Sequence, residues 1–253
     1  MGLLTRAMPP APVQLTLGEI PADCFGATAN PARYVPRSDS ERARRKLERL
    51  VLEEREPIAL VGPNGLGKTL LLRVLARRLR RHFYPLYLPN PAMALDELCT
   101  LALGLANQKT SSNPVRRLGS VAKLLAARGR GLLLLVDDAS AMPIDTAFGL
   151  ASLADESEGA LRLVLALGPA ASTRGIVACL GPQRSVVRLA ERMTLGETGN
   201  YVRERLARSV GRDAAPRVHP NAVMHLYRES RGIPRCVNIA ADRALNRLMA
   251  TAG

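Results

Sequence analysis

The sequence predicts an α/β protein with a parallel sheet at its core, followed by a smaller unit made only of helices. Three observations support this fold class. Short apolar runs alternate with longer segments of helical periodicity up to about residue 190. A glycine-rich turn joins one of these runs to the helical segment that follows it. Beyond about residue 190, three helical segments follow one another with no apolar run between them.

The expected elements can be placed from the pattern of apolar residues. Residues 1–36 are rich in proline and lack periodicity, which indicates an irregular arm. Ser38 and Glu41 have the spacing of a capping box, so a helix is expected from there to about residue 54. The uninterrupted apolar run at 132–136 predicts a strand that is buried on both faces. The other expected strands are 58–61, 83–88 and 161–167, and the other expected core helices are 69–81, 93–106 and 115–127.

The last part of the chain is expected to fold as helices at about 195–209, 218–230 and 234–250. The sequence therefore predicts three parts: an arm at 1–36, an α/β core at 37–190 and a helical lid at 191–253.

The composition excludes several classes of protein. A chain of 253 residues that is 47% hydrophobic is long enough to bury a core without disulfide bonds. No apolar run approaches the roughly 18–20 residues of a membrane-spanning helix, and the N-terminus lacks a signal-peptide pattern. The four cysteines are scattered without the spacing of metal ligands. We therefore expect a cytoplasmic protein with no transmembrane segment and with reduced cysteines.

The glycine-rich turn fits the pattern Gly-x-x-x-x-Gly-Lys-Ser/Thr in full. In such a loop the backbone N–H groups converge on phosphates, the lysine reaches the β- and γ-oxygens, and the hydroxyl binds Mg²⁺. A chance match in a flexible loop is the alternative, but the required strand precedes the loop and the required helix follows it. The sequence shows no Asn-Lys-x-Asp segment that would read guanine, so ATP is the expected nucleotide, with Mg²⁺. The loop residues are Gly62, Pro63, Asn64, Gly65, Leu66, Gly67, Lys68 and Thr69.

A pair of carboxylates follows the apolar run at 132–136. Asp137 stands at the end of this expected strand, where an aspartate can hold the Mg²⁺ of a bound nucleotide. Asp138 is then the candidate base that positions the attacking water. The alternative is that both residues only form a turn or cap the next helix.

With these motifs, the sequence resembles the AAA+ ATPases similar to general secretion pathway protein A. Residues 194–206 are similar to that family's Ser/Thr-x-x-Glu-Thr-x-x-Tyr-Ile/Val-x-x-Arg-Leu helix. Residues 230–238 are similar to its Gly-Ile-Pro-Arg-x-Ile/Val-Asn segment. Weaker similarities lie in the segments from Phe25 to Ser38 and from Asn90 to Leu98.

The resemblance implies a P-loop NTPase fold of the AAA+ type, Mg²⁺-dependent ATP hydrolysis and an ATP-dependent homo-oligomer, either a ring or a filament. It also implies roles for two arginines. Arg235 matches a cation of the lid that reaches the γ-phosphate, and its place after Gly-Ile-Pro is typical of a helix start. Arg184, which follows Gln183, is the best match to an arginine that acts on a neighbouring subunit's nucleotide. Two further arginines, Arg188 and Arg192, compete for that second role.

The chain departs from the family pattern at two places. The family has Glu where this chain has Asp138, whose shorter side chain is expected to hold water less well, so hydrolysis is expected to be slow. The strand expected at 161–167 leads into Gly168 and Pro169, with no Asn, Ser or Thr where AAA+ proteins commonly place a polar sensor.

The chain is strongly basic, with 36 Lys and Arg against 22 Asp and Glu. Residues 1–130 hold 21 of these basic residues against 10 acidic ones, whereas residues 131–253 hold 15 against 12. Two groups of these basic residues have helical spacing and are expected to form stripes that face outwards. Such stripes could neutralise the phosphates of a nucleic acid, or they could simply be solvated. One stripe consists of Arg42, Arg45, Lys46 and Arg49, and the other of Arg73, Arg77, Arg80 and Arg81.

Three functions follow from these features. The lid segments favour an assembly or remodelling ATPase that acts on a protein partner of a secretion or cell-envelope machine. The charge favours a DNA-binding ATPase of the transposition target-selection kind, although only 3% of the residues are aromatic, which argues against base stacking on single strands. The shortened carboxylate at Asp138 allows a nucleotide-gated scaffold that hydrolyses ATP poorly.

Overall fold

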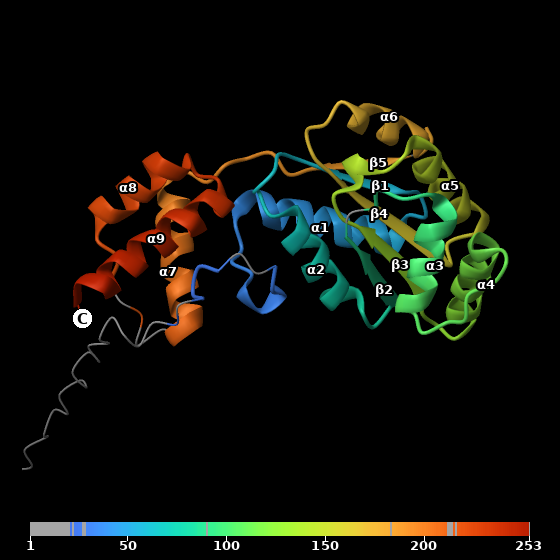
Figure 1. The fold of residues 1–253 in the computed structure, drawn as a ribbon, viewed down its shortest axis with the longest axis horizontal. Coiled ribbons are helices and arrows are strands. Elements are labelled where there is room, and N and C mark those ends of the chain that lie inside the picture. The colour runs from blue at the N-terminus through green and yellow to red at the C-terminus, as the bar shows by residue number, and fades with distance from the viewer. Residues whose placement is uncertain are drawn as a thin grey trace, which may run out of the picture. The chain divides into compact units, whose positions relative to one another are not determined.

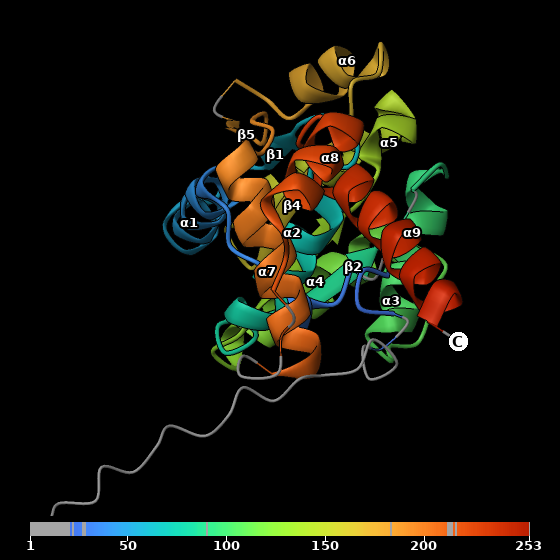
Figure 2. The same cartoon turned by 90° about the vertical axis from the view of Figure 1, so that its left-hand side faces the viewer.

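The computed structural model describes residues 21, 23–26, 29–89, 91–182, 184–211, 215 and 217–252. They form two compact units, each of which is considered by itself (Figures 1 and 2). The core unit runs from Ala29 to Arg192. The helical unit contains the described residues up to Gly26 and those from Met193 onwards. Asn90 and Gln183, which contributed to the resemblance, and most of the expected arm at 1–36 lie outside the described residues.

The core unit is built on a five-stranded sheet of order β2-β3-β4-β1-β5, in which every pair of neighbours is parallel. The expected parallel α/β sheet is thus confirmed. The strands are β1 (Ile58–Val61), β2 (Phe83–Leu88), β3 (Gly131–Val136), β4 (Leu161–Leu167) and β5 (Ser185–Arg188). Sequence reasoning missed β5, a four-residue edge strand in which only Val187 is buried.

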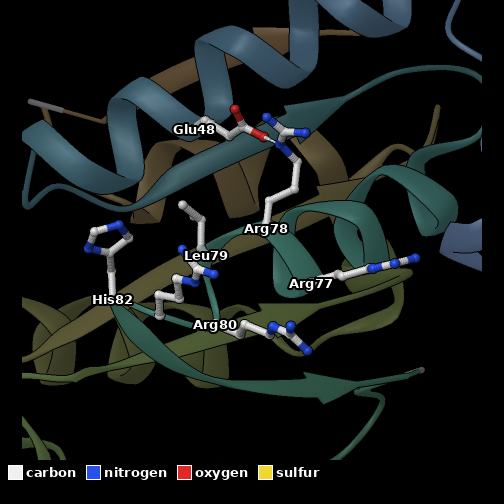
Figure 3. Close-up of a pocket in the computed structure, with 7 residues that line it drawn as sticks. Glu48, Arg77, Arg78, Leu79, Arg80 and His82 are labelled. Atoms are coloured by element: carbon white, nitrogen blue, oxygen red, sulfur yellow. Dashed lines mark ion pairs between the residues drawn. The ribbon is translucent and has the colours of Figure 1, made fainter.

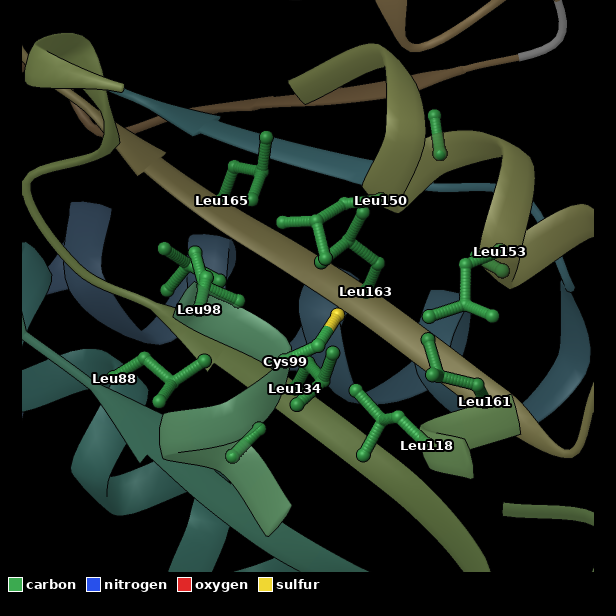
Figure 4. Packing of buried hydrophobic residues seen from close by; sticks show 14 of the residues in the cluster. Leu88, Leu98, Cys99, Leu118, Leu134, Leu150, Leu153, Leu161, Leu163 and Leu165 are labelled. Carbon is green, nitrogen blue, oxygen red and sulfur yellow. The ribbon is translucent and has the colours of Figure 1, made fainter. Parts of the chain in front are cut away.

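Helices cover both faces of this sheet (Figure 1). On one face α1 (Ser38–Glu53) and α2 (Lys68–Leu79) pack on Leu133 and Leu135 of β3. On the other face Leu132, Leu134 and Val136 pack under the remaining helices, as Figure 4 shows for part of this cluster. β3 is therefore buried on both faces, as its sequence predicted. The remaining helices are α3 (Leu95–Leu105), α4 (Pro114–Ala127), α5 (Ile144–Glu156) and α6 (Ser172–Cys179), the last two of which were not expected.

The start of α1 differs from the expected one. Ser38 is the first helical residue, but the capping box expected from Ser38 and Glu41 is wrong. Arg37 is the N-cap residue, and its N–H donates to Ser40 Oγ at 3.1 Å. Glu41 instead accepts from the Tyr34 hydroxyl at 2.9 Å and binds the Arg44 guanidinium. The helix therefore begins one residue earlier than a cap at Ser38 would place it, and Glu41 is engaged by these two side chains instead of by a cap.

The helical unit contains α7 (Leu195–Val210), α8 (Pro220–Ser230) and α9 (Pro234–Ala252), which contact one another. The turn before α9 depends on Gly232, whose φ is 70° and whose backbone lies against the backbone of Met193. A Cβ at Gly232 would lie 2.1 Å from the Met193 carbonyl oxygen, and Met193 N–H donates to the Gly232 carbonyl at 2.8 Å. Within the described part of the chain, none of the helices combines the length and apolar character needed to cross a membrane.

Arg162 stabilises the amino end of β4 through two backbone carbonyls. Its side chain is buried, and it donates to the Val51 carbonyl at 3.0 Å and to the Gly159 carbonyl at 2.8 Å. Val51 belongs to the last turn of α1, where carbonyls lack a partner within the helix. The bond therefore ties the end of α1 to the sheet.

We expect Arg162→Met to lower the free energy of unfolding by about 2–3 kcal/mol, because both carbonyls lose a charged donor. The measurement is urea denaturation monitored by circular dichroism. Arg117→Met, at an exposed position of α4, is the matched control and is expected to change stability by less than about 0.5 kcal/mol. Equal effects of the two variants would contradict the assigned role of Arg162.

Candidate nucleotide site

The glycine-rich loop joins the carboxyl end of β1 to α2. Backbone hydrogen bonds hold the end of the strand on both sides: Gly62 N–H donates to the Leu167 carbonyl at 3.1 Å, and Leu189 N–H donates to the Val61 carbonyl at 2.9 Å. A Cβ at Gly62 would lie 2.1 Å from the Leu189 carbonyl oxygen. Glycine is therefore required at position 62 by the close approach of the chain that follows β5.

The loop then turns through two glycines in the left-handed region, Gly65 with φ 84° and Gly67 with φ 102°. Leu66 between them is buried and anchors the loop, whereas Pro63 and Asn64 are exposed. Gly67 is the N-cap residue of α2, so the free N–H groups and the positive end of the helix dipole lie at the end of the loop. This is the arrangement in which a helix start binds phosphate.

The lysine of the motif lies across its own loop. Lys68 Nζ donates to the Gly62 carbonyl at 2.7 Å and to the Pro63 carbonyl at 3.2 Å, and it is 3.4 Å from Asn64 Oδ1. The ammonium is thus held where phosphate oxygens would arrive. Thr69, the next residue, is half-buried in the first turn of α2.

An arginine that sequence reasoning missed also holds the loop. Arg37, just before α1, donates from Nη2 to the Leu66 carbonyl at 2.7 Å. The two residues are far apart in the sequence, and no local motif signals the contact.

Asp137 follows β3 and is buried, with both carboxylate oxygens engaged. Its Oδ2 accepts from the Tyr87 hydroxyl at 2.7 Å, and its Oδ1 accepts from the Asp138 N–H at 3.0 Å. Burial and the nearby Asp137 carboxylate raise the pKa of Tyr87 to about 12, so this hydroxyl stays a donor at neutral pH. Each carboxylate oxygen has a further lone pair, with which Asp137 can bind a cation.

Asp138 is exposed and has a φ of 51°, in the left-handed region. Asp and Asn adopt this conformation more readily than other residues with a side chain. The backbone at this turn therefore gives a physical reason for aspartate in place of the longer glutamate.

Gly168, at the end of β4, lies between the loop and this acidic pair. β4 separates β1 from β3 in the sheet, and a Cβ at Gly168 would lie 3.1 Å from Asn64 Oδ1. The sequence offers no polar side chain here, but two hydroxyls from elsewhere bind its backbone. Ser140 Oγ accepts from the Gly168 N–H at 2.7 Å, and Thr173 Oγ1 donates to the Gly168 carbonyl at 2.7 Å.

The hydroxyls of Ser140 and Thr173 also lie 3.3 Å from each other, and Ser172 Oγ donates to the Ser140 carbonyl at 2.6 Å. This hydroxyl network, Ser140 with Ser172 and Thr173, joins the turn after Asp138 to the start of α6. Sequence reasoning missed it because α6 was not expected.

The donor set fits Mg²⁺ and a polyphosphate. The loop offers N–H groups and an ammonium to an anion, while Asp137 and Thr69 offer the oxygen ligands that Mg²⁺ prefers. No group of three or more His, Cys, Asp or Glu side chains among the described residues could hold a metal alone. A cation here would therefore share its ligands with the phosphates.

The predicted arginines of the core unit do not all lie at the same end of the sheet. Ser185 pairs with Ile58 at the amino end of β1, so Arg184 lies at the edge of the sheet opposite the loop, where it donates to the Gly181 carbonyl at 2.7 Å. Arg188 pairs with Val61 next to the loop and is exposed, as is Arg192. Arg235 is the exposed second residue of α9 in the helical unit.

This strand order, with a phosphate loop after β1, an acidic pair after β3 and a C-terminal helical unit, defines a P-loop NTPase fold of the AAA+ class. Residues 49–174 match the family described as "AAA domain". No curated protein matches the chain by sequence.

Several solved structures share the fold. The ORC2 protein of Aeropyrum pernix, in ADPNP–ADP complexes, superposes with a TM-score of 0.67 at 14% identity, over 91% of this chain and 67% of that chain. Cdc6p from Pyrobaculum aerophilum gives 0.66 at 15% identity, over 92% and 67%. The Aeropyrum pernix ORC1 protein in complex with DNA gives 0.61 at 15% identity, over 91% and 64%.

We expect Ser140→Ala to lower the free energy of unfolding by about 1–3 kcal/mol, because the buried Gly168 N–H loses its acceptor. Thermal and urea denaturation measure the change. Ser120→Ala removes a comparable hydroxyl from the exposed face of α4 and is expected to be nearly neutral. If Ser140→Ala were equally neutral, the hydroxyl network would have no structural role.

Proposed function

We propose that the core unit binds ATP with Mg²⁺ and hydrolyses it slowly. One observation carries this proposal: the loop from Gly62 to Thr69, Asp137 and Asp138 lie at the carboxyl ends of β1 and β3, on one edge of the sheet. The match of residues 49–174 to an AAA domain supports the same function.

Each residue has a distinct role in this proposal. The N–H groups of the loop and Lys68 bind the β- and γ-phosphates, and Thr69 and Asp137 hold Mg²⁺. When bound, Mg²⁺ neutralises charge on the phosphates. Asp138 orients the attacking water and accepts its proton. Because Asp138 is exposed and short, it holds this water loosely, which makes turnover slow.

We propose that two arginines complete the site, as the resemblance implies. Arg235 of the helical unit is exposed at the start of α9 and supplies a cation to the γ-phosphate. Arg184 serves a neighbouring subunit's nucleotide, because in its own subunit it lies at the edge of the sheet opposite the loop. Arg188 and Arg192 remain alternatives for that role.

Lys68→Ala is expected to weaken ATP binding by about 10- to 100-fold, because hydrogen bonds to a charged group contribute about 1.5–3 kcal/mol. Isothermal titration calorimetry with ATP and Mg²⁺ measures the affinity. Lys123→Ala, on the exposed face of α4, is the control and is expected to bind ATP as the wild type does. Unchanged affinity in Lys68→Ala would overturn the nucleotide site.

Asp138→Asn is expected to reduce ATP hydrolysis by about 10²- to 10⁴-fold, the usual contribution of a general base, while ATP affinity changes little. Asparagine also tolerates the left-handed backbone, so the turn is preserved. Phosphate release and calorimetry separate the two effects. A variant that hydrolyses ATP at the wild-type rate would remove Asp138 from the mechanism. A wild type that binds ATP without turnover would favour the nucleotide-gated scaffold.

We propose that ATP-dependent oligomerisation, into a ring or a filament, is how the protein acts on its partner. The segments at 194–206 and 230–238 support an assembly or remodelling role for a secretion or cell-envelope machine, through their resemblance to general secretion pathway protein A. A second candidate is a DNA-bound ATPase. It is supported by the arginine-rich surface of the core unit and by the fold shared with the Aeropyrum pernix ORC1 protein, whose structure is a complex with DNA.

A further inference from the structure

A basic hollow lies where α2 ends and β2 begins, at the edge of the sheet opposite the phosphate loop. Its volume is about 340 Å³, and it is lined by Glu48 of α1 and by residues 77–82 (Figure 3). Four arginines line it, together with His82, against the single carboxylate of Glu48. We call it the arginine hollow.

The single carboxylate of the hollow is already occupied. Glu48 Oε2 accepts from Arg44 Nη1 at 2.6 Å, and Glu48 Oε1 pairs with Arg78. Figure 3 shows Arg78 turned towards Glu48, whereas Arg77 and Arg80 point away from it. Glu48 therefore cannot neutralise the rest of the hollow.

Three guanidinium groups of the hollow have no partner in the described part of the chain. Arg77, Arg80 and Arg81 are exposed, and their side chains form no ion pair or hydrogen bond with any residue that the structure describes. All three line the same hollow, so their like charges repel one another. A polyanion that spans all three would relieve this repulsion.

The basic stripe of α1 has a different environment. Arg42 pairs with Glu191 at 3.0 Å, while Arg45 and Arg49 lie 4.0 Å from Glu41 and Glu53. The two stripes look alike in the sequence, but among the described residues carboxylates accompany the arginines of α1 and not Arg77, Arg80 and Arg81.

The ring of Tyr84, which lies at the start of β2 beside the hollow, is accompanied by a cation, because Arg130 lies 5.9 Å from its centroid. Arg130 also donates to the Arg80 and Phe83 carbonyls, so it extends the basic surface beside the hollow. A surface made mainly of guanidinium groups suits a phosphate backbone better than unpaired bases.

We propose that the arginine hollow binds the phosphate backbone of double-stranded DNA without reading its sequence. This proposal rests on the second candidate function, a DNA-bound ATPase, and names the surface that would contact the DNA. The hollow is a site distinct from the phosphate loop, because the two lie at opposite ends of α2.

The test compares two variants of the full chain that lose the same charge. One is Arg77→Gln/Arg80→Gln/Arg81→Gln, and the other, on α1, is Arg42→Gln/Arg45→Gln/Arg49→Gln. Fluorescence anisotropy with a duplex of about 30 base pairs, at salt concentrations of about 50 and 200 mM, gives the affinity and its salt dependence. Calorimetry with ATP and Mg²⁺ is run on the same samples, and circular dichroism checks the fold.

The hollow variant is expected to lose at least about tenfold in duplex affinity at low salt, and its salt slope is expected to fall by about 2–3, close to one for each lost phosphate contact. The α1 variant is expected to lose less than about threefold, and both variants are expected to bind ATP as the wild type does.

Three results would overturn the assignment: equal losses in both variants, no duplex binding by the wild type at low salt, or tighter binding of polyglutamate than of the duplex. If the wild type binds ATP but no duplex, DNA binding by the arginine hollow is refuted and the nucleotide site is not. A wild type that binds the duplex but no ATP refutes the nucleotide site and leaves the hollow supported.

Discussion

The parallel pairing of β1 with β4 on one side and β5 on the other is the constraint on which the candidate site depends. It fixes the end of β1, so the loop that follows must begin in a narrow space against the Leu189 carbonyl, where only Gly62 fits. It also places the end of β4 between the loop and the acidic pair after β3. One strand of the sheet thereby separates the loop that carries Lys68 from the turn that carries Asp137.

At the carboxyl end of β4, the backbone is held by side chains from other segments of the chain. Gly168 has no side chain, and its backbone is held instead by hydroxyls that approach from the turn after Asp138 and from α6. A buried amide and carbonyl are satisfied in this way without a polar residue at the end of β4. The same network connects the turn that carries Asp138 with α6, so a displacement of one of these segments would displace the other.

The basic side chains of the core unit differ in whether a carboxylate lies beside them. The chain is arginine-rich along two helices, but carboxylates on α1 and at Glu191 accompany the arginines of the first, whereas Glu48 serves only Arg44 and Arg78 near the second. The net charge of the chain therefore says less about its partners than the positions of its acidic residues do. The contrast between a partly neutralised stripe and an unpaired cluster is visible only once both helices are packed on the sheet.

The sequence by itself determined four of the five strands of the sheet, most of the described helices, the loop from Gly62 to Thr69 and the acidic pair, because apolar periodicity and glycine spacing are local properties of the chain. It did not reveal β5, α5, α6, the true cap of α1 or the contacts of Arg37 and Ser140, since these depend on short or weakly patterned segments and on residues distant in the sequence. Tertiary structure alone decided that Arg184 lies at the end of the sheet opposite the loop and that Arg77, Arg80 and Arg81 have no carboxylate partner among the residues that the structure describes. The physical reason is that strand register and the pairing of charges are set by which segments pack together, and no local pattern encodes that choice.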